Sequence, residues 1–257
     1  MLGLGNSLSG GIASMGSIPS DIEGLDIWLR FNVDVVGDAG GASNDSDMAD
    51  GEDINSWADQ SGNSRHASQD TAAHKPHWET DAADLGGLKF TAGAHHLNLA
   101  SNVSISANQD FTAMMRVKIT DVSAARALYG DDAQDVVKIA SGNNKKLTTL
   151  IGGSGASSWE EASATIEQDT YYIITLTRSN GDSGTLELRV HGGSHDDKSW
   201  DAAEEHTDAD AFTISNVGSS TDSALHLHGV VKDFMVWKGT ALTTGQRSDM
   251  YNYILGQ

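Results

Sequence analysis

Residues 54–69 read INSWADQSGNSRHASQ. Trp57 closes a short strand-like run, an Asp-x-Ser-Gly-Asn segment follows it, and a second short polar run comes next. Asp, Gly and Asn favour turns, because Gly accepts positive φ and the Asx side chains bond to their own backbone. Near the other end of the chain, residues 229–237 read GVVKDFMVW, which is again typical of a strand. Short strands joined by such turns predict an all-β fold.

A period of two residues runs through the chain from Gly24 onward. In residues 111–119 the apolar side chains fall on one face, as in a half-buried antiparallel strand: Phe111, Ala113, Met115, Val117 and Ile119. Residues 171–178 and 185–190 form a second pair, and the Asn-Gly between them favours a tight hairpin. Further strands are expected near residues 25–31, 87–91, 96–99, 127–130, 135–140, 147–151, 212–217 and 224–237.

One helix is expected at the C-terminal end of the sequence. Thr243 or Thr244 supplies the N-cap, and Gly256 is the stop signal after Leu255. Met250 and Ile254 share one face of this helix with Tyr253, which predicts packing on a sheet. Since no internal repeat or interior linker is found, residues 23–257 are interpreted as one domain.

Residues 1–22 are interpreted as an extended arm. The segment is rich in Gly and Ser, with apolar residues spaced along it: Leu2, Leu4, Leu8, Ile12 and Met15. It has too little apolar content to build a core of its own. A disordered tail and an arm ordered against a partner subunit are both compatible with this composition. We favour the arm, and therefore a homo-oligomer or a place in a larger assembly.

The composition narrows the classes of partner. The 257 residues include 16 basic and 36 acidic ones, a formal charge of −20, so a nucleic-acid backbone would be repelled. The acidity either serves solubility or includes Ca²⁺ ligands. There are no cysteines, which excludes disulfides and thiolate metal sites. No apolar run is long enough for a membrane span, and the N-terminus lacks the pattern of a signal peptide.

Taken in order, seven segments resemble the laminin-G-like, or concanavalin A-like, jelly-roll domains. They cover residues 24–255: GLDIWL at 24–29, the turn unit at 56–63, KPHW at 75–78, GLKF at 87–90, the strand from Phe111, the hairpin at 178–192, and the closing strand with its helix. The resemblance implies an antiparallel jelly-roll β-sandwich with a short C-terminal helix. It also implies that the first and last strands lie side by side and that rim loops are free to bind ligands.

The residues of these segments and the order of the segments also resemble modules of bacteriophage virion proteins, namely fibres, head decorations and adhesion subunits. This resemblance implies a protein made in the host cytoplasm and carried on a particle. Its partners would be other virion subunits, reached through the arm, and host-surface glycans.

Catalysis is disfavoured by a missing motif. The glucanases that share this sandwich place acid and nucleophile on one strand face through a Glu-x-Asp-x-Glu strand. No such triplet occurs here, and the core strand at 185–190 offers only Glu187. We therefore expect no enzymatic activity and no cofactor, with Ca²⁺ as the one ion that deserves a test.

Two groups of residues are candidate Ca²⁺ ligands, because loop carboxylates and amides supply the hard oxygens that Ca²⁺ prefers. Asp45 and Asp47 lie in an acidic loop that is not an EF-hand, and Asp59 and Asn63 flank the glycine turn. The alternative for Asp59 and Asn63 is hydrogen bonding within the turn, which we favour. Zinc is a weaker hypothesis: His226 and His228 share a strand face, with His95, His96 and His191 as further candidates, but a complete ligand set is not visible.

Sugar recognition would use aromatic platforms beside polar groups. Trp78, Trp159 and Trp200 lie in polar, loop-like contexts and are the candidate platforms, whereas Trp28, Trp57 and Trp237 are expected in the core. The preferred interpretation is a non-enzymatic structural or adhesive component of a phage particle. The alternative is a free carbohydrate-binding lectin with rim Ca²⁺.

Overall fold

The structure is a computed structural model. It describes residues 17–38, 48–80, 86–91, 94–107, 109–132, 134–140, 145–151, 159–179, 185–192, 204–205, 211–219 and 225–257. For residues 159–164, 185 and 204–205 it describes the backbone alone.

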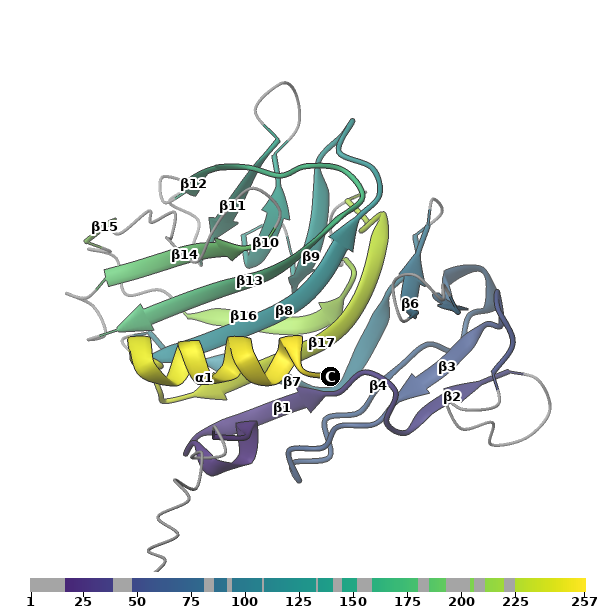
Figure 1. Cartoon of the computed structure of the whole chain (residues 1–257), viewed down its shortest axis with the longest axis horizontal. Coiled ribbons are helices and arrows are strands. Elements are labelled where there is room, and N and C mark those ends of the chain that lie inside the picture. The colour runs from purple at the N-terminus through teal and green to yellow at the C-terminus, as the bar shows by residue number, and fades with distance from the viewer. Residues whose placement is uncertain are drawn as a thin grey trace, which may run out of the picture.

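Two antiparallel sheets stack into a sandwich (Figure 1). The eight-stranded sheet contains, in spatial order, β15 (Glu204–Glu205), β14 (Thr185–His191), β13 (Thr170–Ser179), β8 (Phe111–Ile119), β17 (Gly229–Lys238), β6 (Gly87–Phe90) and β5 (His77–Glu79), while β1 (Leu25–Leu29) also pairs with β17. The nine-stranded sheet contains β12 (Trp159–Thr165), β11 (Lys146–Leu150), β10 (Val136–Ile139), β9 (Arg126–Gly130), β16 (Phe212–Val217), β7 (Leu97–Ile105), β4 (Ala67–Ser68), β3 (Ile54–Trp57) and β2 (Val35–Gly37). The expected jelly-roll sandwich is confirmed.

Strands from opposite ends of the chain close the eight-stranded sheet. β1 runs antiparallel to β17, with Leu25 opposite Trp237 and Leu29 opposite Phe234. The expectation that the first and last strands lie side by side is therefore confirmed. Most predicted strands lie within a few residues of their expected bounds, but β7 extends to Ile105, and β17 begins only at Gly229.

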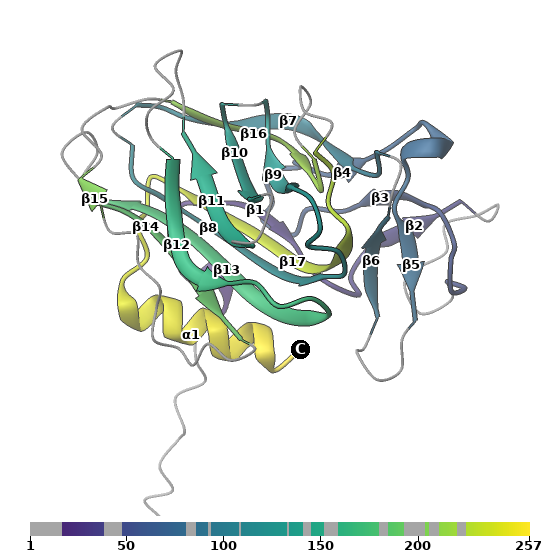
Figure 2. The same ribbon diagram turned by 90° about the horizontal axis from the view of Figure 1, so that it is seen from above.

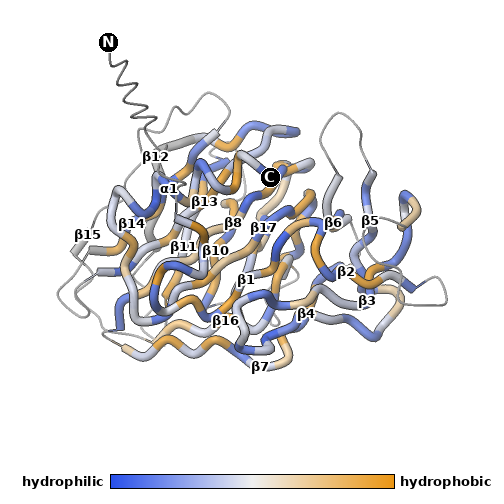
Figure 3. The backbone as a smooth tube through the Cα atoms, turned by 60° about the horizontal axis from the view of Figure 1, so that its bottom comes forward, coloured by the Kyte–Doolittle hydropathy of each residue, from blue (hydrophilic) through white to orange (hydrophobic). Residues whose placement is uncertain are grey.

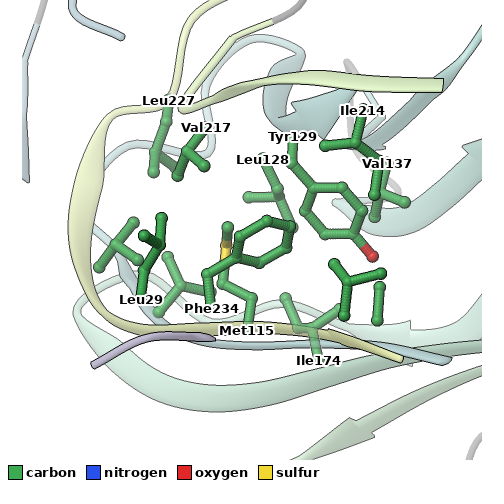
Figure 4. Close-up of a cluster of buried hydrophobic side chains, with 14 of the residues drawn as sticks. Leu29, Met115, Leu128, Tyr129, Val137, Ile174, Ile214, Val217, Leu227 and Phe234 are labelled. Atoms are coloured by element: carbon green, nitrogen blue, oxygen red, sulfur yellow. The ribbon is translucent and has the colours of Figure 1, made fainter. Parts of the chain in front are cut away.

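The main core fills the space between the two sheets (Figure 4). Met115 and Phe234 enter it from the eight-stranded sheet, and Tyr129 and Val137 enter from the nine-stranded sheet. The rings of Tyr129 and Phe234 lie 4.9 Å apart. Figure 3 shows hydrophobic and hydrophilic stretches alternating along the strands, as expected when one face of each strand is buried.

The outer face of the eight-stranded sheet carries a second apolar cluster under α1 (Thr244–Leu255). Met250 and Ile254 of the helix pack there against Met114, Ile173 and Trp237. Thr243 is the N-cap and Gly256 follows the last turn, as the sequence predicts. Two short 3-10 helices complete the described elements: η1 (Pro19–Asp21), whose Pro19 carbonyl accepts from Trp237 Nε1 at 3.4 Å, and η3 (Ala72–His74).

Candidate functional site

The Asp59 turn is a structural device. The Asp59 carboxylate accepts hydrogen bonds from the backbone N–H groups of Trp28 at 2.8 Å, Ser61 at 2.9 Å and Arg65 at 3.0 Å, and from Ser61 Oγ at 2.7 Å. Asn63 Nδ2 donates to the Leu25 carbonyl at 2.9 Å. These bonds tie the turn between β3 and β4 to β1. The turn interpretation of Asp59 and Asn63 therefore explains their geometry.

The part of the chain that the structure describes contains no complete set of ligands for Ca²⁺ or Zn²⁺. Within it, no group of three or more His, Asp or Glu residues could hold a metal ion. The oxygens of Asp59 are already engaged by the protein's own donors. Asp45 and Asp47 lie outside the described residues. His191 stacks on Tyr251, with ring centroids 5.0 Å apart.

The four tryptophans whose side chains the structure describes all lie in strands and are buried. Trp57 and Trp237 are fully buried and Trp28 nearly so, as expected for core residues. Trp78, a candidate platform, does not lie in a loop: it belongs to β5, is 4 % exposed, and stacks on Phe31 with 5.8 Å between ring centroids. A sugar cannot reach a ring covered in this way. Trp200 lies outside the described residues, and Trp159 is described by its backbone alone.

The outer face of the nine-stranded sheet carries a small buried apolar cluster, called the patch below, whose members Ala127, Val136 and Leu150 are 0 %, 1 % and 5 % exposed. Ala127, Val136 and Leu150 come from three adjacent strands, and Leu225 packs against them from the segment before β17. Figure 2 shows that α1 lies on the far side of the molecule, against the other sheet. The patch is therefore separate from both the main core and the helix-covered cluster.

Two polar side chains adjoin this patch. Asn216 lies opposite Gly130 of β9, and because its neighbour Val217 faces the core, strand alternation puts Asn216 on the outer face. Asn216 is 1 % exposed, and its Nδ2 donates to Ser215 Oγ at 2.7 Å. Its Oδ1 is buried and accepts no hydrogen bond from the described residues. A buried polar atom without a partner is costly and calls for an explanation.

Lys138 is the cationic member of the same face. It lies opposite Ala127 on one side and Thr148 on the other, so its side chain adjoins the patch. Burial lowers the pKa of its ammonium group. The register also places the backbone of Trp159 opposite Leu150, at the margin of the patch. We call Ala127, Val136, Lys138, Leu150, Asn216 and Leu225 the outer-face site.

The outer-face site combines aliphatic side chains with an amide and an ammonium group. Aliphatic side chains pack against the apolar faces of sugars, while amide and ammonium groups bond hydroxyls or carboxylates. Sequence reasoning missed all six residues of this site; among the candidate residues it did name, Trp159 lies at the margin. The alternation of residues 136–139 and 212–217 was the available signal, but it cannot tell which face the helix covers.

No protein-family model matches the sequence, and no curated protein matches it. Solved structures do match the fold. Domain 4 of AbnA, a GH43 extracellular arabinanase from Geobacillus stearothermophilus solved with arabinotriose, gives a TM-score of 0.56 at 13 % identity, covering 88 % of this chain and 97 % of that domain.

Two larger enzymes match with parts of their chains. An arabinofuranosidase complexed with arabinofuranosyl-α-1,2-xylobiose gives a TM-score of 0.52 at 12 % identity, covering 91 % of this chain and 59 % of its own. A Trypanosoma rangeli sialidase gives 0.50 at 14 % identity, covering 89 % of this chain but 32 % of its own. At such identities the likeness shows a shared β-sandwich fold. No described helix is long and apolar enough to cross a membrane.

Proposed function

We propose that this protein is a non-enzymatic, lectin-like module that recognises carbohydrate through the outer-face site. One observation carries the proposal: an apolar patch on the sheet face opposite α1 lies beside a buried amide oxygen that has no partner among the described residues. Ala127, Val136, Leu150 and Asn216 are at most 5 % exposed, so a ligand must displace part of the chain to reach them; its hydroxyl would then satisfy that oxygen.

The fold comparisons support this choice of ligand class. The similar domain of the arabinanase was solved with arabinotriose, so a sandwich of this shape can hold a pentose oligosaccharide. The proposal that the present chain does not cleave its ligand rests on the missing Glu-x-Asp-x-Glu strand.

We further propose that the module is carried on a bacteriophage particle as a decoration, fibre or adhesion subunit. The support is the resemblance of its segments to virion modules and the aliphatic spacing of residues 1–22, which would attach it to neighbouring subunits. Residues 1–16 lie outside the described part of the chain. Ile22 packs under α1 as part of the domain, so a deletion that tests the arm should stop at residue 16.

A glycan array tests the recognition step. Wild-type protein should bind pentose-rich or acidic glycans, and Asn216→Ala should lose at least about tenfold in affinity if a buried hydrogen bond to the sugar is removed. Alanine also removes a buried side chain and the Nδ2 hydrogen bond to Ser215 Oγ, so the unfolding temperature should fall, and binding is compared at a temperature at which both proteins are folded. Asn252→Ala, an exposed position on α1, is the matched control.

Three results of the array would count against the proposal: silence on every glycan, equal binding by Asn216→Ala, or loss of binding in the Asn252→Ala control. Binding that vanishes with a chelator would favour the alternative, a free lectin with rim Ca²⁺.

Particle attachment is tested in cells that produce the phage. Antibody detection on purified particles should find the full chain and miss a chain that lacks residues 1–16, while both chains fold and bind the same glycans. Equal incorporation of both chains would contradict the role of the arm.

A further inference from the structure

Six of the ten histidines meet at one end of the sandwich. The chain crosses there between the two sheets at least three times: from β4 to β5, from β6 to β7 and from β16 to β17. Each of these crossovers carries two histidines, so the pairs are His74 with His77, His95 with His96, and His226 with His228. We call these six residues the histidine cluster.

Direct contacts join the first two crossovers. The rings of His74 and His96 lie 5.4 Å apart, and those of His77 and His95 lie 4.8 Å apart, edge to face. The backbone N–H of His96 donates to the His74 carbonyl at 3.0 Å. The third crossover is close enough for His226 to sense the charges of His74 and His96, and for His95 to sense that of His228.

His95 and His96 are hydrogen-bonded in a way that requires neutral rings. His95 Nδ1 accepts from the backbone N–H of Thr91 at 3.3 Å. His96 Nδ1 faces the Ala94 carbonyl at 2.8 Å and must donate to it, so the other ring nitrogen, Nε2, accepts from the Gln69 amide Nε2 at 3.0 Å. A proton added to either accepting nitrogen would place two donors against each other and break that bond.

Burial and the neighbouring histidines oppose protonation of these two rings and outweigh Asp53, whose charge favours protonation of His95, and the Ala94 carbonyl, which favours that of His96. Burial, followed by the neighbouring His77, lowers the pKa of His95, and burial lowers the pKa of His96. Burial also lowers the pKa of His226 and His228, helped at His226 by His96 and at both by Arg126. The two carboxylates that face the cluster are engaged by other rings: Asp53 contacts His77 Nδ1 at 2.7 Å, and Asp121 contacts His228 Nδ1 at 3.2 Å.

We propose that His95 and His96 form an acid-sensitive latch at neutral pH, in which His96 bonds the β6–β7 crossover to Gln69 of the β4–β5 crossover and His95 closes the β6–β7 crossover on Thr91 beside His77, and that mildly acidic pH releases both bonds. A histidine with a lowered pKa contributes stability that is complete above its ordinary value of 6.5 and is lost as the pH falls through the lowered value. The β6–β7 crossover should therefore be released at pH values below 6.5. This release is confined to this end of the sandwich, because the sheets themselves contain no comparable group of histidines among the described residues.

Hydrogen exchange of the full chain between pH 7.5 and 5.0 tests the latch. The amides of Thr91 and His96 report on it directly, since both donate to groups in the cluster. Below pH 6.5 their protection, corrected for intrinsic exchange, should fall by about tenfold per pH unit for each proton that opening takes up. The amides of β8 and β13 should keep their protection over the same range.

Two substitutions remove the titration and keep the acceptors. In His95→Asn the amide oxygen replaces Nδ1, and in His96→Gln it replaces Nε2. The double variant should lose the pH-dependent fall in protection. His66→Asn is the matched control, because His66 Nδ1 also accepts a backbone N–H, from Asp59 at 3.0 Å, but its side chain is exposed and outside the cluster.

The latch is refuted if crossover protection stays constant with pH, if it falls equally in the double variant, or if β8 and β13 lose protection together with it. Should the double variant fail to fold, NMR titration of the wild-type imidazoles decides the question. Values below 6.5 for His95 and His96, with signal changes that coincide with the loss of protection, support the latch. Values at or above 6.5 overturn it.

Discussion

At the scale of single residues, the Asp59 carboxylate joins β1 to the turn that follows β3. It accepts from Trp28 in β1 and from Ser61 and Arg65 in the turn that follows β3. Asp59→Ala leaves these donors without their partner inside a buried turn, so we expect a loss of at least about 3 kcal/mol in the free energy of unfolding. Denaturant unfolding measures it, with Asp70→Ala at an exposed position as the control. A loss below that of the control would contradict this role.

Asp233 gives a prediction with a pH dependence. Its carboxyl is fully buried, and one oxygen accepts from Phe31 N–H at 3.3 Å while the other is buried without a hydrogen bond from the described residues. Burial raises its pKa from 3.8 to about 6, despite the nearby Arg116, Arg30 and Lys232. The protonated form therefore stabilises the fold below pH 4, and that stability is lost as the pH rises through 6.

Asp233→Asn keeps the acceptor for Phe31 and removes the charge. We expect the variant to be more stable than the wild type at pH 8 by about 3 kcal/mol, since each pKa unit corresponds to 1.36 kcal/mol, and the gain should shrink toward zero near pH 4. Unfolding curves at several pH values measure the difference. A gain that is equal at pH 4 and pH 8, or absent at both, would show that burial of this carboxylate is not the cause.

At the scale of elements, α1 depends on a capping box. Thr243 Oγ1 accepts from the Gln246 backbone at 3.3 Å, and Gln246 Oε1 accepts from the Thr243 backbone at 2.9 Å. Thr243→Ala should cost about 1 kcal/mol and fray the first turn. Ser248→Ala, exposed within the helix, should not destabilise the protein. Thermal unfolding of both variants distinguishes capping from a general effect of alanine.

The residues within a segment were enough to predict α1 and most strands. The errors occurred where a strand is defined by its pairing with another part of the chain. The cap, the apolar face and Gly256 all lie within one segment, so the helix could be predicted from it. Trp78 was misplaced because polar neighbours and Pro76 disguise β5, a three-residue strand that only its pairing with β6 defines. The strand containing Trp159 was missed for the same reason, since its pairing with β11 is not visible in its own sequence.

At the scale of the whole molecule, the fold depends on contact between the two ends of the chain. Ile27 and Leu29 of β1 are fully buried and their strand pairs with β17. A chain that begins at residue 30 should therefore fail to unfold cooperatively, whereas one that begins at residue 17 should melt as the full chain does. Calorimetry of both fragments measures this. A cooperative transition at an unchanged temperature in the shorter fragment would contradict the closure.

The jelly roll was predictable because its seven segments occur in the order expected for such domains. That order is informative even though each motif alone is weakly specific. The outer-face site was not, because it depends on which sheet α1 covers and on Leu225 reaching the patch from another part of the chain. Strand alternation separates Asn216 from Val217, but it does not say that Asn216 Oδ1 is buried without a partner among the described residues. Such a property exists only once the tertiary contacts are formed.

The proposal that glycan recognition belongs to the outer-face site is tested most directly by a hydrogen-exchange footprint. Exchange is compared with and without the glycan that binds best on the array. We predict added protection in β9, β10, β11 and β16, and no change in α1. Added protection confined to α1 or to the Asp59 turn, with none in those four strands, would contradict the account.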